Sequence, residues 1–165
     1  MTILGDKREA RAAALVDKAN DVTREGDYAK AIKLWTTVVD ESLHLFDKPA
    51  NIYIARSSCY LELGELEKAL QDAEDAIFHE PRSTEAHFYR GGSLAEMIVL
   101  GKGRDRFDEA WASLQRVLDA EPKNKDAREW RGRIEHLRTN LPRGSHGYGK
   151  PYEREVQVEL PFWKR

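Results

Sequence analysis

The feature that most constrains the fold of this chain is an internal repeat. Three segments, residues 14–39, 53–81 and 87–122, each contain two amphipathic helical stretches with a break between them, and the third is interrupted near its middle. Within each stretch, apolar residues recur at intervals of three and four, which predicts helices that bury one face. A single helix pair cannot cover its own apolar face, whereas stacked pairs bury a continuous core. The repeat therefore predicts an all-α chain of stacked helix pairs.

Glycine and proline mark the breaks between the expected helices. Gly64 follows the first helical stretch of the second repeat, where glycine adopts the left-handed cap conformation without a steric penalty. Gly26, followed by Asp27 and Tyr28, makes the same turn in the first repeat. Pro81 ends the second repeat because proline cannot continue a helix.

Small residues recur where the two helices of a pair must approach each other closely. They are Ala19, Ala31, Ser57, Ala69, Gly91 and Ala110. Bulkier side chains lie between them along the first helices, and this alternation lets antiparallel helices pack at short range.

This pattern resembles the tetratricopeptide repeat (TPR), a helix-turn-helix unit of about 34 residues. The resemblance covers residues 12–124, and Gly64, Ala69, Ala76 and Pro81 of the second repeat carry it. It implies a right-handed α-solenoid of three TPR helix pairs. The second repeat is also similar to the TPRs of eukaryotic cytosolic co-chaperones.

Two regions depart from the TPR pattern, and one further helix is expected after the third repeat. The first repeat has about 38 residues, so its second helix is expected to extend to about Phe46. The third repeat has about seven extra residues within 97–106, which predicts either a mobile basic loop or a lengthened first helix that ends at Leu100. Residues 125–139 have one apolar face and are expected to form a C-terminal capping helix.

The chain is expected to divide into a TPR domain, residues 1–141, and a tail, residues 142–165. The tail begins with a turn-rich, flexible stretch, and its apolar residues then alternate with polar ones, which favours an extended conformation. We expect a contact site formed by Val156, Val158, Leu160, Phe162 and Trp163. It would dock on the helices of its own chain or on a partner, including a second copy of this protein; a disordered end is the alternative.

No arrangement of residues indicates catalysis or metal binding. The five histidines have no metal-ligand spacing, and Cys59 is the only cysteine. His87 and Cys59 occupy positions expected in the helical core. We therefore expect no enzymatic activity, no cofactor and no metal. The start of the chain does not resemble a signal peptide, and no apolar run is long enough to span a membrane. These features favour a soluble cytoplasmic or nuclear protein.

The TPR resemblance implies that the first helix of each repeat lines a concave groove for an extended peptide of a partner. The residues that the repeat frame places there are Val16, Asn20, Arg24, Asn51, Ala55, Ser58, Glu62, Glu85, Phe88, Tyr89, Gly92 and Glu96. The function expected is therefore that of a protein–protein interaction adaptor, with a co-chaperone-like role. The alternative is a structural subunit of a larger complex that uses the convex face or the tail.

A nucleic-acid partner is not favoured by the charge of the chain. The formal net charge is -2, and the basic residues near the C-terminal end are interspersed with acidic ones. Phosphate binding needs a clustered basic face. RNA binding through this end therefore ranks below peptide binding.

One family feature can be compared residue by residue. Many co-chaperone TPRs bind the carboxylate tail of large heat-shock chaperones through two lysines, two asparagines and one arginine at fixed positions. The positions that match the motif here hold Val16, Asn20, Ala55, Glu85 and Tyr89, so only Asn20 agrees. Glu85 reverses the charge that would pair with a peptide carboxylate. Binding of chaperone tails is therefore not expected.

Overall fold

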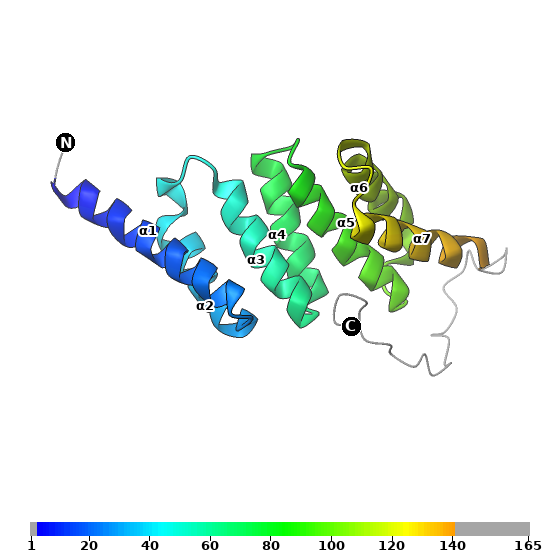
Figure 1. Ribbon diagram of the computed structural model, residues 1–165, viewed down its shortest axis with the longest axis horizontal. Coiled ribbons are helices and arrows are strands. Elements are labelled where there is room, and N and C mark those ends of the chain that lie inside the picture. The colour runs from blue at the N-terminus through cyan, green and yellow to red at the C-terminus, as the bar shows by residue number, and fades with distance from the viewer. Residues whose placement is uncertain (1–2, 141–165) are drawn as a thin grey trace.

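The computed structural model describes residues 3–140, which form one elongated stack of helices (Figure 1). The helices are α1 (Ile3–Arg24), α2 (Tyr28–Ser42), α3 (Pro49–Leu63), α4 (Leu66–His79), α5 (Thr84–Val99), α6 (Phe107–Ala120) and α7 (Lys125–Asn140), with two short 3-10 helices, η1 (Leu43–Leu45) and η2 (Arg104–Arg106). Helices α1 to α6 form three antiparallel pairs, and α7 packs on both α5 and α6. This confirms the predicted all-α solenoid of three helix pairs and a capping helix.

The turns between helices form where the sequence predicts them. Gly26 and Gly64 have φ angles of 80° and 75°, a left-handed conformation that glycine adopts without strain. The Asp27 side chain then caps α2 by accepting a hydrogen bond from the Lys30 backbone N–H at 3.1 Å. Pro49 begins α3, at a position where a helix does not need a backbone N–H donor.

The core lies between the helices of each pair and between successive pairs. The small residues predicted at the close approaches are all buried: Ala19, Ala31, Ser57, Ala69, Gly91 and Ala110. A Cβ atom added to Gly91 would come within 2.8 Å of the Leu114 side chain. The spacing of α5 and α6 therefore requires a residue without a side chain at this position.

The first repeat differs from its prediction at both ends. Helix α1 begins at Ile3, well before the expected start of the repeat at residue 14. Residues 7–14 are lysine, arginine, glutamate and alanine, which favour helix even where little is buried. At the other end, α2 stops at Ser42 and η1 continues to Leu45, so the expected extension to about Phe46 combines two helix types.

The extra residues of the third repeat lie mostly after α5, in a turn and in η2 (Arg104–Arg106), while α5 itself has 16 residues against the 15 of α3. Helix α5 ends at Val99, one residue before the predicted end. Two of the basic residues that follow, Lys102 and Arg106, pair with acidic residues of α4. Lys102 Nζ lies 3.2 Å from Glu67 Oε1, and Arg106 Nη2 lies 3.1 Å from Glu74 Oε1. These ion pairs fasten the insertion to the preceding repeat.

The predicted tail contact residues lie outside the described residues. Within residues 3–140, none of the helices is both long enough and apolar enough to cross a membrane.

Candidate peptide-binding site

The candidate site lies on the side of the stack formed by α1, α3, α5 and α7, which we call the first-helix face (Figure 1). Two pockets lie along this face. One is bounded by α1 and α3, and the other lies where α5 meets the turn between α6 and α7.

The amino-terminal pocket, between α1 and α3, has a volume of about 460 Å³. Its lining residues are Val16, Asn20, Trp35, Phe46, Asp47, Lys48, Asn51, Ile52 and Ala55. Trp35 of α2 is 2% exposed and forms the apolar floor. The pocket brings together four of the predicted groove residues: Val16, Asn20, Asn51 and Ala55.

Five residues of this pocket are not among those predicted from the sequence: Trp35, Phe46, Asp47, Lys48 and Ile52. Phe46, Asp47 and Lys48 belong to the segment that joins η1 to α3. The repeat frame assigns groove positions to the first helices alone, so a connecting segment falls outside it. The available signal was the length of the first repeat, because extra residues between two helices must lie beside one of them.

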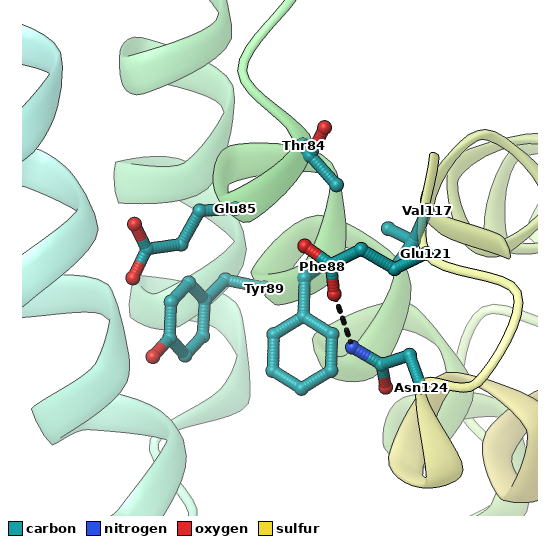
Figure 2. Close-up of a pocket in the computed structure, with 7 residues that line it drawn as sticks. All are labelled: Thr84, Glu85, Phe88, Tyr89, Val117, Glu121 and Asn124. Atoms are coloured by element: carbon teal, nitrogen blue, oxygen red, sulfur yellow. Dashed lines mark hydrogen bonds between the residues drawn. The ribbon is translucent and has the colours of Figure 1, made fainter. Parts of the chain in front are cut away.

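The carboxyl-terminal pocket has a volume of about 290 Å³ and is lined by Thr84, Glu85, Phe88, Tyr89, Val117, Glu121 and Asn124. Figure 2 shows the Glu85 carboxylate beside the Tyr89 ring and the Glu121 carboxylate near the Phe88 ring. Asn124 Nδ2 donates a hydrogen bond to Glu121 Oε2 at 3.0 Å, which holds that carboxylate in place. The pocket thus combines two acidic side chains with two aromatic ones.

The two aromatic rings are held in a fixed arrangement. The Phe88 and Tyr89 ring centroids are 5.3 Å apart with an angle of 81° between the planes. Phe88 also packs against Trp130 of α7, with ring centroids 5.0 Å apart. Burial, followed by the negative charge of Glu85, raises the pKa of Tyr89 to about 12. The Tyr89 hydroxyl therefore stays neutral at physiological pH.

Two predicted groove residues lie beneath the capping helix and not on the open face. Glu96 is 5% exposed, accepts a hydrogen bond from Trp130 Nε1 at 2.9 Å and pairs with Arg133 Nη1 at 2.7 Å. Gly92 is buried, and a Cβ atom there would lie 2.5 Å from the Trp130 ring. The prediction that these positions line an open groove therefore needs correction, because α7 covers them.

The remaining predicted residues lie on or near the first-helix face without lining either pocket. Arg24 is exposed and pairs with Asp21 at 2.9 Å. The Ser58 hydroxyl donates to the Ala55 carbonyl oxygen at 2.8 Å, within α3. The charge of Glu62, also on α3, contributes to raising the pKa values of both Tyr28 and Tyr89. Glu62 therefore lies close enough to both tyrosines to influence their ionisation.

The residues best suited to catalysis or metal binding are packed inside the protein. Cys59 is fully buried, and burial raises the pKa of its thiol, which makes it a poor nucleophile. His87 is 7% exposed, and its Nε2 lies 3.1 Å from the Pro81 carbonyl oxygen. In the part of the chain that the structure describes, no three His, Cys, Asp or Glu side chains are placed to hold a metal ion.

Comparison with known protein families and sequences shows what the chain is similar to. The family model of the tetratricopeptide repeat matches residues 16–78 and 102–143. Outer dynein arm-docking complex subunit 4 of Mus musculus is 43% identical over 56 residues, which are 34% of this chain and 8% of that protein. Tetratricopeptide repeat protein 12 of Homo sapiens is 34% identical over 112 residues, or 68% of this chain and 14% of that protein.

The Hsp70-Hsp90 organizing protein of Triticum aestivum is 26% identical over 110 residues, which are 67% of this chain and 17% of that protein. The matched segments thus span between 8% and 17% of the length of these three relatives.

Solved structures show the same arrangement of helices. The Arabidopsis OM64 TPR domain superposes with a TM-score of 0.65 at 24% identity, covering 81% of this chain and 99% of that domain. The second TPR domain of human RPAP3, solved in complex with the HSP70 peptide SGPTIEEVD, gives a TM-score of 0.62 at 26% identity, covering 78% of this chain and 98% of that domain.

Proposed function

The chain belongs to the tetratricopeptide repeat family, and we propose that it is an adaptor that binds an extended segment of a partner protein on its first-helix face. The observation that carries the proposal is the position of the two pockets. Val16, Asn20, Asn51 and Ala55 line one pocket, while predicted groove residues of α5 line the other. Stacked helix pairs present such a continuous surface to an extended ligand.

The amino-terminal pocket offers complementary groups for a peptide backbone and an apolar side chain. The amides of Asn20 and Asn51 can each donate and accept hydrogen bonds, as the backbone of an extended peptide requires. Trp35 and Ile52 supply an apolar surface below them. A small number of placed polar groups above an apolar floor is typical of ligand sites.

The relatives support a peptide as the class of ligand. The second TPR domain of human RPAP3 was solved with an HSP70 peptide, and the wheat relative is named as an organizing protein for Hsp70 and Hsp90. We therefore propose a non-enzymatic, co-chaperone-like role in the cytoplasm. The partner differs from the acidic chaperone tails, because four of the five clamp positions hold other residues.

A displayed library of random peptides tests the proposal. We expect the wild-type protein to enrich related sequences and an Ala55→Arg variant to lose them, because the arginine fills the amino-terminal pocket. The matched control is Ala112→Arg, which makes the same change at an exposed position of α6, a second helix. If the wild type enriches no related peptides, or if the Ala55→Arg variant still enriches them, binding on this face is contradicted. Thermal unfolding of each variant verifies that it is folded.

One observation favours a second candidate function, that of a structural subunit bound through the outer helices. Phe78 near the end of α4 is 82% exposed, which is unusual for a large apolar side chain. If this side chain anchors an assembly, Phe78→Asp should dissociate it while Ala55→Arg leaves it intact.

A further inference from the structure

We propose that the carboxyl-terminal pocket is a specificity site that binds a lysine or arginine side chain of the partner segment. This inference rests on the proposed function, since it names the residue type that the partner places in one of the two pockets. It follows from the negative charge of the pocket wall and from the arrangement of its aromatic rings. Two nearby arginines are also held by other groups and do not line the pocket.

The wall of the pocket carries negative charge without a basic residue to offset it. Glu85 and Glu121 both line the pocket, and none of its seven lining residues is Lys, Arg or His. A peptide carboxylate would be repelled from this surface, whereas a cation would be attracted to it.

The aromatic rings offer a second, independent means of binding a cation. An ammonium or guanidinium group is attracted to the face of an aromatic ring within about 6 Å of its centroid. Phe88 and Tyr89 line the pocket in direct edge-to-face contact, with ring planes 81° apart, so a cation would meet the side of this pair that is turned to the pocket. Because Phe88 is braced by Trp130, the arrangement exists before a ligand arrives.

Two arginines on the helices beside the pocket, Arg116 of α6 and Arg128 of α7, are held by backbone carbonyl groups. Arg116 Nη1 donates to the Pro81 carbonyl oxygen at 3.3 Å, and Arg128 Nε donates to the Pro122 carbonyl oxygen at 2.9 Å. These contacts tie the two guanidinium groups to the α4–α5 and α6–α7 turns. Neither arginine therefore occupies the pocket, and none of the residues that line it supplies a cation to its two carboxylates.

Helices α5 and α7 begin beside the pocket, and the positive ends of their dipoles would repel a cation. Side-chain caps already offset this effect. The first N–H groups of both helices carry partial positive charge. Ser83 caps α5 by accepting from the Ala86 N–H at 3.2 Å, and Asn124 caps α7 by accepting from the Ala127 N–H at 3.0 Å. Glu85 also lies in the first turn of α5. The full charges of the two glutamates thus dominate the pocket.

The volume of the pocket fits the end of a long basic side chain. About 290 Å³ is roughly ten times the share of one water molecule in the liquid, about 30 Å³. An ammonium or guanidinium group can therefore enter with part of its aliphatic stem and a few of its waters. The stem would lie along Phe88, and the charged end near Glu85 and Glu121.

A charge-swap experiment on peptides from the displayed library tests the inference. We expect the enriched peptides to carry lysine or arginine at one fixed position, and replacement of that residue by norleucine to weaken binding about tenfold in isothermal titration. The Glu85→Lys change should weaken binding of the original peptide by at least as much. A peptide with glutamate at the fixed position should then bind Glu85→Lys better than it binds the wild type.

The matched control is Glu135→Lys, which makes the same charge change at an exposed position of α7 that lines neither pocket. It should leave the affinity for the original peptide unchanged at equal ionic strength.

The outcomes separate this inference from the function on which it rests. Peptides that are enriched without a basic residue, or a Glu85→Lys variant that binds them as the wild type does, would overturn the cation site and leave the adaptor function standing. No enrichment at all would overturn both. Loss of binding in Glu85→Lys without recovery by the glutamate peptide would also refute the cation site, because it would indicate general damage to the face.

Discussion

Replacing Trp130 by alanine removes the side chain that joins α7 to the third repeat. Trp130 is 2% exposed, lies against Gly92 and donates a hydrogen bond to the buried Glu96 carboxylate. Truncation of a buried tryptophan costs about 3–5 kcal/mol because it leaves a cavity. Glu96 keeps its ion pair with Arg133, so the lost hydrogen bond adds only about 1 kcal/mol.

The expected loss is therefore about 4–6 kcal/mol of unfolding free energy, a large part of the roughly 5–15 kcal/mol typical of a whole domain. For a chain of this size, it corresponds to a fall in Tm of roughly 10–20 °C. Urea unfolding followed by circular dichroism measures it. Because each repeat contacts only its neighbours, hydrogen exchange should accelerate in α5 to α7 much more than in α1 and α2.

The matched control is Trp111→Ala on α6. Trp111 is only half-buried, and its ring is contacted by the Arg131 guanidinium carbon, 5.2 Å from the ring centroid. Its removal should cost about 1–2 kcal/mol, from partial burial and one cation–π contact. If Trp130→Ala costs no more than Trp111→Ala, or if α1 and α2 exchange as fast as α7, the reasoning about the cap is refuted.

Three further predictions concern binding, ionisation and the tail. The acidic peptide SGPTIEEVD should show negligible affinity for the wild type in isothermal titration, and the combined Val16→Lys, Ala55→Asn and Glu85→Lys changes should create measurable binding. The pKa of Tyr89, about 12, should appear as a late step in absorbance at 295 nm that is missing in Tyr89→Phe. Because this pKa is raised in the folded state, the contribution of Tyr89 to stability is lost as the pH rises above about 10. Truncation after Asn140 should alter thermal stability, oligomeric mass or partner binding if residues 156–163 form a contact site, and three unchanged values would exclude that role.

The helix pairs could be predicted from the sequence because their determinants are local or repeat at a fixed spacing. Gly64 ends α3 whatever lies around it, since the left-handed conformation there favours glycine. Ala69 and Ala110 recur at equivalent positions of the second helices, where a larger residue would separate a pair. The same reasoning identified α7 from the single apolar face formed around Trp130.

The limits of the sequence prediction arise where one element covers or lengthens another. Glu96 lies on the same side of α5 as Phe88 and Tyr89 in the repeat frame, but α7 packs over it and supplies the hydrogen bond and ion pair that make burial of a carboxylate tolerable. Lys48 lines a pocket because the first repeat is long, and a length does not specify a path in space. Both effects depend on tertiary packing.

The fold and the ligand of this chain depend on different residues, which is why a relative's ligand does not transfer with its fold. Packing is set by buried small side chains such as Ala69 and Gly91, where any larger residue would separate two helices. Glu85 is exposed, so replacing a lysine there by glutamate changes stability little, since surface ion pairs contribute only about 0–1 kcal/mol. The same replacement reverses the charge that a bound peptide meets. A repeat can therefore keep its architecture while its preference changes from acidic to basic partners, and in this chain the negative pocket at α5 supports that change.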